Sequence, residues 1–320
     1  MNETDDNAPG SQEPAVPEQA TVPLTASLPI LRRLRPIPFA ILVLATVFVL
    51  YQLVGGVLTL LFLGGKIVEE NVNVMRWATF GGQILFLLVP TLILARLRAS
   101  RPGDFFRWRV PGYREILLTV VAVFALQQIL QGYMAVQDAI PLPGPIERFV
   151  EEFRRLLEET YRLLVTAHSP AEFLVVVLVV ALTPAVCEEV LFRGLVQRSF
   201  EEEAGGFRAA IMTGVIFGAY HMSPFSLIPL AVLGIFFGFV VYRTGNLLVA
   251  VAAHFFNNFM ACLAAYFQLE DDFVAVDPLG AASGTIMALN VLLFAVVFVV
   301  ATYYFTRITR PAPDPGGRGV

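Results

Sequence analysis

Long apolar runs constrain this chain more than any other feature of its sequence. A helix needs about 20 consecutive apolar residues to cross the roughly 30 Å hydrocarbon layer of a bilayer. Runs of this kind cover residues 37–63, 77–97, 116–136, 171–200, 207–221, 225–242, 247–269 and 285–304. We therefore predict an all-α fold: a polytopic membrane bundle of about eight transmembrane helices, the fifth of them short.

The composition agrees with a membrane protein and excludes other classes. Hydrophobic residues make up 57% of the chain and charged residues 15%, whereas a soluble domain has about half apolar and about a quarter charged residues. The mean hydropathy is +0.70. A net charge of −4 provides no basic field to hold a nucleic acid, so we expect the bilayer, and no nucleic acid, as a partner.

The chain divides into one membrane domain and two tails. Residues 1–30 are rich in Pro, Glu, Asp and Asn, a composition typical of a disordered tail, and residues 311–320 form a second, Pro/Gly-rich tail. Residues 31–310 then form the transmembrane helical domain. Within it, residues 145–165 have apolar side chains at helical spacing and charges on the other face. This pattern predicts an amphipathic helix along the outer membrane surface or across the bundle.

The distribution of charged residues between the runs predicts the orientation in the membrane. Arginines precede the first run, crowd the segment between the second and third, and mark the ends of later runs: Arg32, Arg33, Arg35, Arg96, Arg98, Arg101, Arg107, Arg109, Arg114, Arg208, Arg243, Arg307 and Arg310. The alternate loops carry acidic residues: Glu69, Glu70, Glu270, Asp271, Asp272 and Asp277. The positive-inside rule therefore predicts a multi-pass cell-membrane protein with both termini in the cytoplasm, which requires an even number of helices.

Ionisable residues interrupt the fourth run, although each costs at least about 2.5–3.5 kcal/mol within a bilayer. Glu189 and Arg193 have the i, i+4 spacing of an ion pair. The adjacent Glu188 has no such partner and faces another direction, because successive helical residues are about 100° apart. Pro184 removes one backbone hydrogen bond and can open the helix beside the two acids.

Polar residues recur in the fifth and seventh runs. His221 ends the fifth run, and His254 and Asn258 share one face of the seventh. Taken singly, each of these residues could be a structural hydrogen-bonding group between helices. Together with the acids they form a candidate functional site in mid-membrane. Small-residue motifs predict close packing of the fifth and sixth runs beside it: Gly214-x-x-x-Gly218 and Gly234-x-x-x-Gly238.

These residue types suit the attack of water on an amide. A desolvated glutamate beside a histidine can hold and deprotonate a water molecule. A second histidine with an asparagine can donate hydrogen bonds to a developing oxyanion. The same acids would also suit a proton-coupled transporter, but such proteins are often built from internal repeats, which this sequence does not display.

The pattern Glu188-Glu189-x-x-x-Arg193, Phe217-x-x-x-His221, His254-x-x-x-Asn258 resembles the signature motifs of the CPBP family of intramembrane proteases, named for CAAX proteases and bacteriocin-processing enzymes. Its eukaryotic members are type II CAAX prenyl endopeptidases. The resemblance covers the motif core at residues 171–269 and implies an intramembrane endopeptidase. It implies these roles: Glu188 as general base, His221 as its partner, His254 and Asn258 as the oxyanion hole, and Glu189 and Arg193 as supporting residues.

The resemblance leaves cofactor and substrate open. The family is described as metal-dependent, and Glu188, His221 and His254 could form a zinc-binding set of two histidines and a glutamate. We favour metal-free water activation, because each residue then has one role. The implied substrate is a membrane-associated protein or peptide, lipidated in CAAX-type C-terminal processing. The alternative within the same fold is a non-catalytic membrane protein such as an immunity or assembly factor.

Overall fold

The computed structural model describes residues 29–99, 103, 105–141, 143–269 and 281–311. Over these ranges the chain forms helices and connecting segments and no strand. The predicted tails fall almost wholly outside the described residues, as do Arg101 and the predicted acidic loop at residues 270–280. A short helix, α1 (Pro29–Arg33), starts at the end of the predicted N-terminal tail. Arg98 holds this part of the chain by donating hydrogen bonds to the carbonyls of Leu31 and Leu34.

Apart from the predicted amphipathic segment, the remaining elements lie largely within the predicted apolar runs. Several long helices contain short π-helical stretches, labelled η1, η3, η5 and η6, and η2 is a 3₁₀ turn; both kinds are included below among the remaining elements. In chain order they are α2 (Pro36–Phe48), η1 (Val49–Gly55), α3 (Gly56–Phe62), η2 (Glu69–Asn71), α4 (Val72–Gly82), η3 (Gln83–Leu88), α5 (Val89–Arg98), α6 (Tyr113–Asp138), α7 (Gly144–Val165), α8 (Pro170–Val176), η5 (Val177–Leu182), α9 (Thr183–Glu189), η6 (Val190–Val196), α10 (Gln197–Ala204), α11 (Gly206–Tyr220), α12 (Leu227–Thr244), α13 (Leu247–Tyr266) and α15 (Ala281–Ile308).

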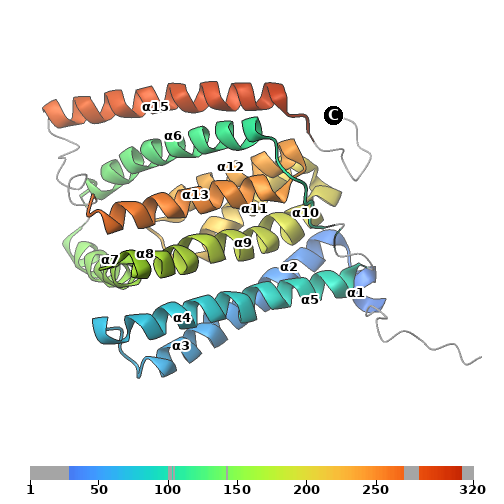
Figure 1. Ribbon diagram of the computed structural model, residues 1–320, viewed down its shortest axis with the longest axis horizontal. Coiled ribbons are helices and arrows are strands. Elements are labelled where there is room, and N and C mark those ends of the chain that lie inside the picture. The colour runs from blue at the N-terminus through green and yellow to red at the C-terminus, as the bar shows by residue number, and fades with distance from the viewer. Residues whose placement is uncertain (1–28, 100–102, 104, 142, 270–280, 312–320) are drawn as a thin grey trace, which may run out of the picture.

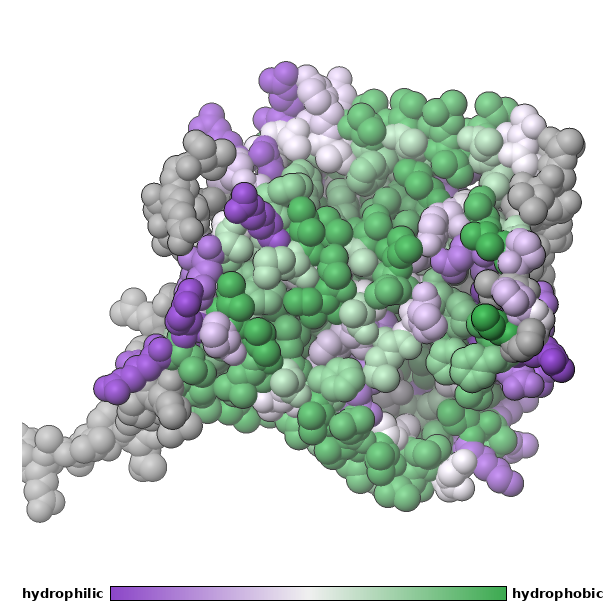
Figure 2. Space-filling model, turned by 180° about the vertical axis from the view of Figure 1, so that it is seen from behind, coloured by the Kyte–Doolittle hydropathy of each residue, from purple (hydrophilic) through white to green (hydrophobic). Residues whose placement is uncertain are grey.

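The described helices confirm a polytopic all-α membrane protein. Seven continuous helices in this part of the chain are long and apolar enough to cross a membrane. The apolar α11 is the short eighth one, as predicted for the fifth run: its 15 residues reach only about 22 Å at 1.5 Å per residue. Figure 2 shows the matching surface, with apolar side chains across the middle and hydrophilic ones at both ends.

The helices lie side by side in layers (Figure 1). The long helix Pro170–Ala204, which runs from α8 to α10, is the central one: 56% of its apolar window is buried, against 6% for the peripheral Gly284–Ile308. The N-terminal hairpin from α2 to α5 lies on one side of the central helix, while α13, α6 and then α15 follow on the other. The ribbon places α1 and the end of α15 at the same end of the bundle.

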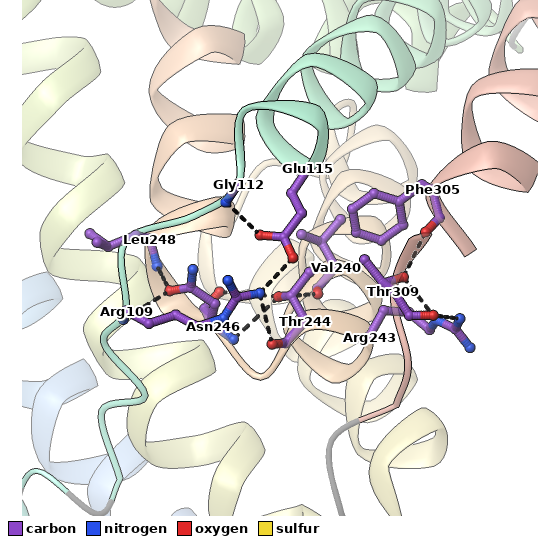
Figure 3. A network of polar contacts seen from close by, with 10 residues as sticks. All are labelled: Arg109, Gly112, Glu115, Val240, Arg243, Thr244, Asn246, Leu248, Phe305 and Thr309. Carbon is purple, nitrogen blue, oxygen red and sulfur yellow. Dashed lines mark hydrogen bonds and ion pairs between the residues drawn. The ribbon is translucent and has the colours of Figure 1, made fainter. Parts of the chain in front are cut away.

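Polar contacts close that end of the bundle (Figure 3). The Arg109 guanidinium donates to Glu115 at the start of α6 and to the Thr244 carbonyl at the end of α12. The buried Asn246 side chain accepts the Leu248 amide of α13 at 3.1 Å. Arg243 donates to the Thr306 carbonyl at 2.6 Å, which ties α12 to the last helix. These bonds hold the ends of α6, α12, α13 and α15 in fixed positions relative to one another.

The predicted amphipathic helix is present as α7, at the other end of the bundle (Figure 1). Its C-terminal end is anchored by Arg76 of α4, whose side chain is 1% exposed. The Arg76 guanidinium donates to the carbonyls of Leu164 and Thr166 and to the Glu172 carboxylate. Arg76 therefore neutralises an acid and satisfies carbonyls that a helix end leaves without partners.

The two glycine motifs bring α11 and α12 into close contact, as predicted. A Cβ atom added to Gly214 would lie 2.3 Å from the Ile235 amide nitrogen, and one added to Gly218 would lie 2.7 Å from that of Ala231. Any larger residue would push the two helices apart. This hairpin carries His221 at its turn, so its close packing helps to place that histidine.

Candidate functional site

The two acids lie at the end of α9, where the central helix changes to the π-helical stretch η6. A second π-helical stretch, η5, ends just before Thr183 and Pro184. Such stretches rotate the following side chains relative to a regular α-helix and are frequent at functional sites. Here the Glu189 side chain is 0% exposed and that of Glu188 is 13% exposed. The two neighbours therefore have different surroundings, as the sequence predicts.

Glu189 is the centre of a buried ion-pair network. Its Oε1 atom lies 2.7 Å from Nη1 of Arg193, which confirms the predicted i, i+4 pair. The same oxygen lies 2.9 Å from Nδ1 of His254 on α13. One carboxylate oxygen therefore joins the central helix to α13 and orients the His254 ring.

Arg193 is completely buried and makes further contacts beyond Glu189. Its Nη2 atom donates to the Gly234 carbonyl of α12 at 2.8 Å. Its guanidinium carbon lies 4.5 Å from the centre of the Phe217 ring and 5.4 Å from that of Phe237. Arg193 thus connects the central helix to the α11–α12 hairpin through a hydrogen bond and cation–π contacts.

His221 follows the last residue of α11 and faces Glu188. Its Nδ1 atom lies 2.8 Å from the Phe217 carbonyl, which can only accept, so Nδ1 is the donor and carries the hydrogen. Its Nε2 atom lies 3.9 Å from Oε2 of Glu188, and its side chain is 32% exposed. In the neutral ring, Nε2 is therefore an acceptor directed at the acid, on the more open side of the site.

His254 approaches the same glutamate from α13. Its Nε2 atom lies 4.0 Å from Oε2 of Glu188. The ring is stacked on Phe237, with centroids 5.4 Å apart, and meets the edge of Phe217. With Nδ1 held by Glu189 and the ring packed against Phe237 and Phe217, the orientation of His254 is fixed before any substrate binds.

The predicted residues Glu188, His221 and His254 are thus brought together, while Asn258 lies one helical turn away from His254. Its Nδ2 atom donates to the Val180 carbonyl of η5 at 3.0 Å. Its Oδ1 atom accepts from the Asn257 side chain at 3.1 Å. One amide hydrogen of Asn258 is therefore committed to the central helix, and the other is available to a ligand.

Oε2 of Glu188 is buried and has no hydrogen-bond partner among the described residues. A water placed about 2.8 Å from this oxygen and from either Nε2 atom would subtend an angle near 90°, which is compatible with hydrogen bonding. Zinc bonds of about 2.0–2.1 Å would instead bring tetrahedral ligands to about 3.4 Å from one another. In the structure these separations are 3.9 and 4.0 Å. Within the described ranges, no cluster of three or more His, Cys, Asp or Glu meets the geometry of a metal site.

The structure adds residues that sequence reasoning missed. Tyr51 of η1 and Tyr220 of α11 lie within electrostatic range of Glu188. The Tyr220 carbonyl accepts from Gln52 at 3.0 Å, and the Tyr220 hydroxyl donates to the Leu44 carbonyl at 3.2 Å. The N-terminal hairpin therefore contributes to the surroundings of the site. The adjacency of Tyr220 to His221 was the one signal available in the sequence.

The proteins similar to this chain include a bacterial relative and a family of endopeptidases. The chain is 26% identical over 197 residues to a protein of Bacillus subtilis (strain 168) named "Putative membrane peptidase YdiL". The matched residues make up 62% of this chain and 75% of that protein. No solved structure matches the chain significantly. Residues 170–260 match the family described as type II CAAX prenyl endopeptidase Rce1-like. The resemblance drawn from the three motifs is therefore confirmed for this segment. At the level of the family, the segment is that of a membrane protease.

Proposed function

We propose that this protein is an intramembrane endopeptidase that uses a water molecule activated by Glu188 and His221. The observation that carries the proposal is the buried Oε2 atom of Glu188, which has no hydrogen-bond partner among the described residues yet faces the Nε2 atoms of two histidines within 4.0 Å. A buried polar atom left without a partner is costly, so such an atom in a native structure requires an explanation. A water molecule that binds there as a substrate would supply the hydrogen-bond partner that this oxygen lacks.

The two acceptors orient the water for attack. Glu188 as a carboxylate and Nε2 of neutral His221 both accept hydrogen bonds, so the water donates both of its hydrogens to them. Its lone pairs are then free to attack a carbonyl carbon. As the C–O bond forms, one proton passes to Glu188, and it is later delivered to the departing amine.

The opposite side of the site is suited to stabilise the oxyanion. Glu188 and Glu189 carry two negative charges and Arg193 one positive charge, so protonation of His254 balances the buried charge. Charge balance matters here because an uncompensated ion in hydrocarbon is expensive. Protonated His254 donates Nδ1–H to Glu189 and keeps Nε2–H for the oxyanion. The second amide hydrogen of Asn258 is proposed as the other donor.

The substrate class and the metal belong to the same proposal. The match to prenyl endopeptidases supports C-terminal processing of a membrane-associated, lipidated protein or peptide. A zinc ion, if bound, would be held by Glu188, His221 and His254 and would polarise the substrate carbonyl.

The arginines at the end of the bundle that holds α1 and the end of α15 (Figure 1) support cytoplasmic termini.

The test compares the membrane proteomes of cells that carry wild-type protein, Glu188→Gln or Glu158→Gln, the last a matched change at an exposed glutamate on α7. We expect proteins with shortened C-termini in wild-type and Glu158→Gln cells and their full-length forms in Glu188→Gln cells. Identical C-termini in all three strains would contradict proteolysis and favour a non-catalytic role for the fold.

A further inference from the structure

A proline in the central helix removes a backbone donor close to the site. Val180 lies in the π-helical stretch η5, and in the α-helical register on either side of that stretch its carbonyl would accept the amide hydrogen of residue 184. Residue 184 is proline, which has no amide hydrogen. Within the membrane, a carbonyl that loses its helical donor is costly unless another polar group satisfies it.

Asn258 supplies that group from a different helix. Its Nδ2 atom donates to the Val180 carbonyl at 3.0 Å, across 78 residues of sequence. Its Oδ1 atom accepts from Asn257 at 3.1 Å, so both ends of the amide are held. The bond therefore fixes the height and the rotation of α13 relative to η5 and α9.

The position of this bond relates it to the chemistry. Asn258 follows His254 by one helical turn on the same face of α13, and Pro184 precedes Glu188 by one turn on the central helix. A shift of α13 along the central helix would move Nε2 of His254 relative to Oε2 of Glu188, which lie 4.0 Å apart. A misplacement of about 1 Å at such a site can cost about 10²-fold in rate.

We propose that Pro184 is a positioning residue: by freeing the Val180 carbonyl for Asn258, it sets the register of α13 and thereby places His254 against Glu188. The proposal rests on the proposed proteolysis for its kinetic consequences, whereas the bond itself is independent of any substrate. Pro184 touches no reacting atom and acts through Val180 and Asn258.

This role predicts an unusual combination of effects. Pro184→Ala restores an amide hydrogen to the helix and removes a residue that disfavours helix interiors. The variant should therefore be at least as stable as wild type, although its site is less well ordered. A purely structural proline would give the opposite result, in which stability and activity fall together.

The experiment is a double-mutant cycle on purified full-length protein with Pro184→Ala, Asn258→Ala and both changes combined. Thermal unfolding in detergent needs no substrate. Kinetics use an internally quenched farnesylated peptide with a CAAX C-terminus in proteoliposomes. Pro90→Ala is the matched control, because Pro90 also follows a π-helical stretch at the start of a helix but lies outside the two helices that the bond joins.

We expect Asn258→Ala to lower the unfolding midpoint by about 1–4 °C in the wild-type background and by less than half of that in the Pro184→Ala background. We expect Pro184→Ala to lower kcat about 10–100-fold at unchanged KM. In the Asn258→Ala background, Pro184→Ala should lower kcat no further. The control Pro90→Ala should lower kcat much less than Pro184→Ala does. Additive changes in the midpoint, or a wild-type kcat in Pro184→Ala, would overturn the proposal. If the wild-type protein leaves the peptide intact, the proposed function fails on that substrate and the midpoints alone decide whether the bond depends on Pro184.

Discussion

Replacing Arg193 by methionine leaves the Glu189 carboxylate buried without its guanidinium partner. Both side chains are 0% exposed, and the ion pair between them is 2.7 Å long. The change also removes the hydrogen bond to the Gly234 carbonyl and the cation–π contact with Phe217. Methionine keeps the length of the side chain, so the change in packing is small compared with the loss of charge.

The size of the effect follows from the burial. Removing one partner of a buried ion pair typically costs about 3–5 kcal/mol, because the remaining charge is uncompensated. At about 2–4 °C per kcal/mol for a chain of this order of size, the unfolding midpoint should fall by roughly 6–20 °C. Catalysis should also fall, since Glu189 holds the His254 ring through Nδ1 at 2.9 Å.

The assay is thermal unfolding of purified Arg193→Met, Glu189→Gln and the double variant in detergent. The double variant has no unpaired buried charge, so it should recover at least half of the midpoint that Arg193→Met loses. Arg155→Met is a control, because the Arg155–Glu159 pair on α7 is largely exposed and such pairs are worth little. Wild-type stability in Arg193→Met, or additive losses in the double variant, would refute the reasoning.

Three further predictions concern the anchor of α7, the metal and the topology. Arg76→Met should destabilise the protein by about 1–3 kcal/mol, because the Leu164 and Thr166 carbonyls lose their side-chain donor and Glu172 loses its ion-pair partner, and should expose the segment between α7 and α8 to limited proteolysis; an unchanged proteolysis pattern would contradict this. Activity should survive in preparations verified to be free of zinc, whereas near-stoichiometric zinc with activity that is lost to a chelator and restored by zinc alone would contradict the metal-free mechanism. A cysteine placed at Arg310 should react with a membrane-impermeant maleimide only after the membrane is opened, and labelling of intact cells would place that end outside.

The sequence was most informative where one helix carries the whole signal. The apolar runs predict the membrane helices, the i, i+4 rule predicts the pair Glu189–Arg193, and the glycine motifs predict the close contact of α11 with α12. Each of these inferences needs only the periodicity of one segment. The amphipathic pattern likewise identifies α7 but does not say what anchors it.

The contacts between distant helices could not be predicted in this way. Glu189 and His254 are 65 residues apart, and their contact depends on how two helices are rotated and shifted relative to each other. The π-helical stretches around Pro184 change that rotation, and no local pattern in the sequence specifies them. The link between Asn258 and Val180 follows from the same geometry. The motifs therefore identified the residues of the site, while the arrangement of the helices determines which of these residues are in contact.

The most direct test of the central claim is the kcat of Glu188→Gln, measured with the farnesylated peptide in proteoliposomes. Glutamine keeps the size of the side chain, and the buried Oε2 atom has no hydrogen bond to lose among the described residues, so the variant should still fold and purify, and its unfolding midpoint is measured beside kcat. Loss of a general base should lower kcat about 10²–10⁴-fold. A folded Glu188→Gln protein that cleaves the peptide at the wild-type rate would contradict water activation by Glu188.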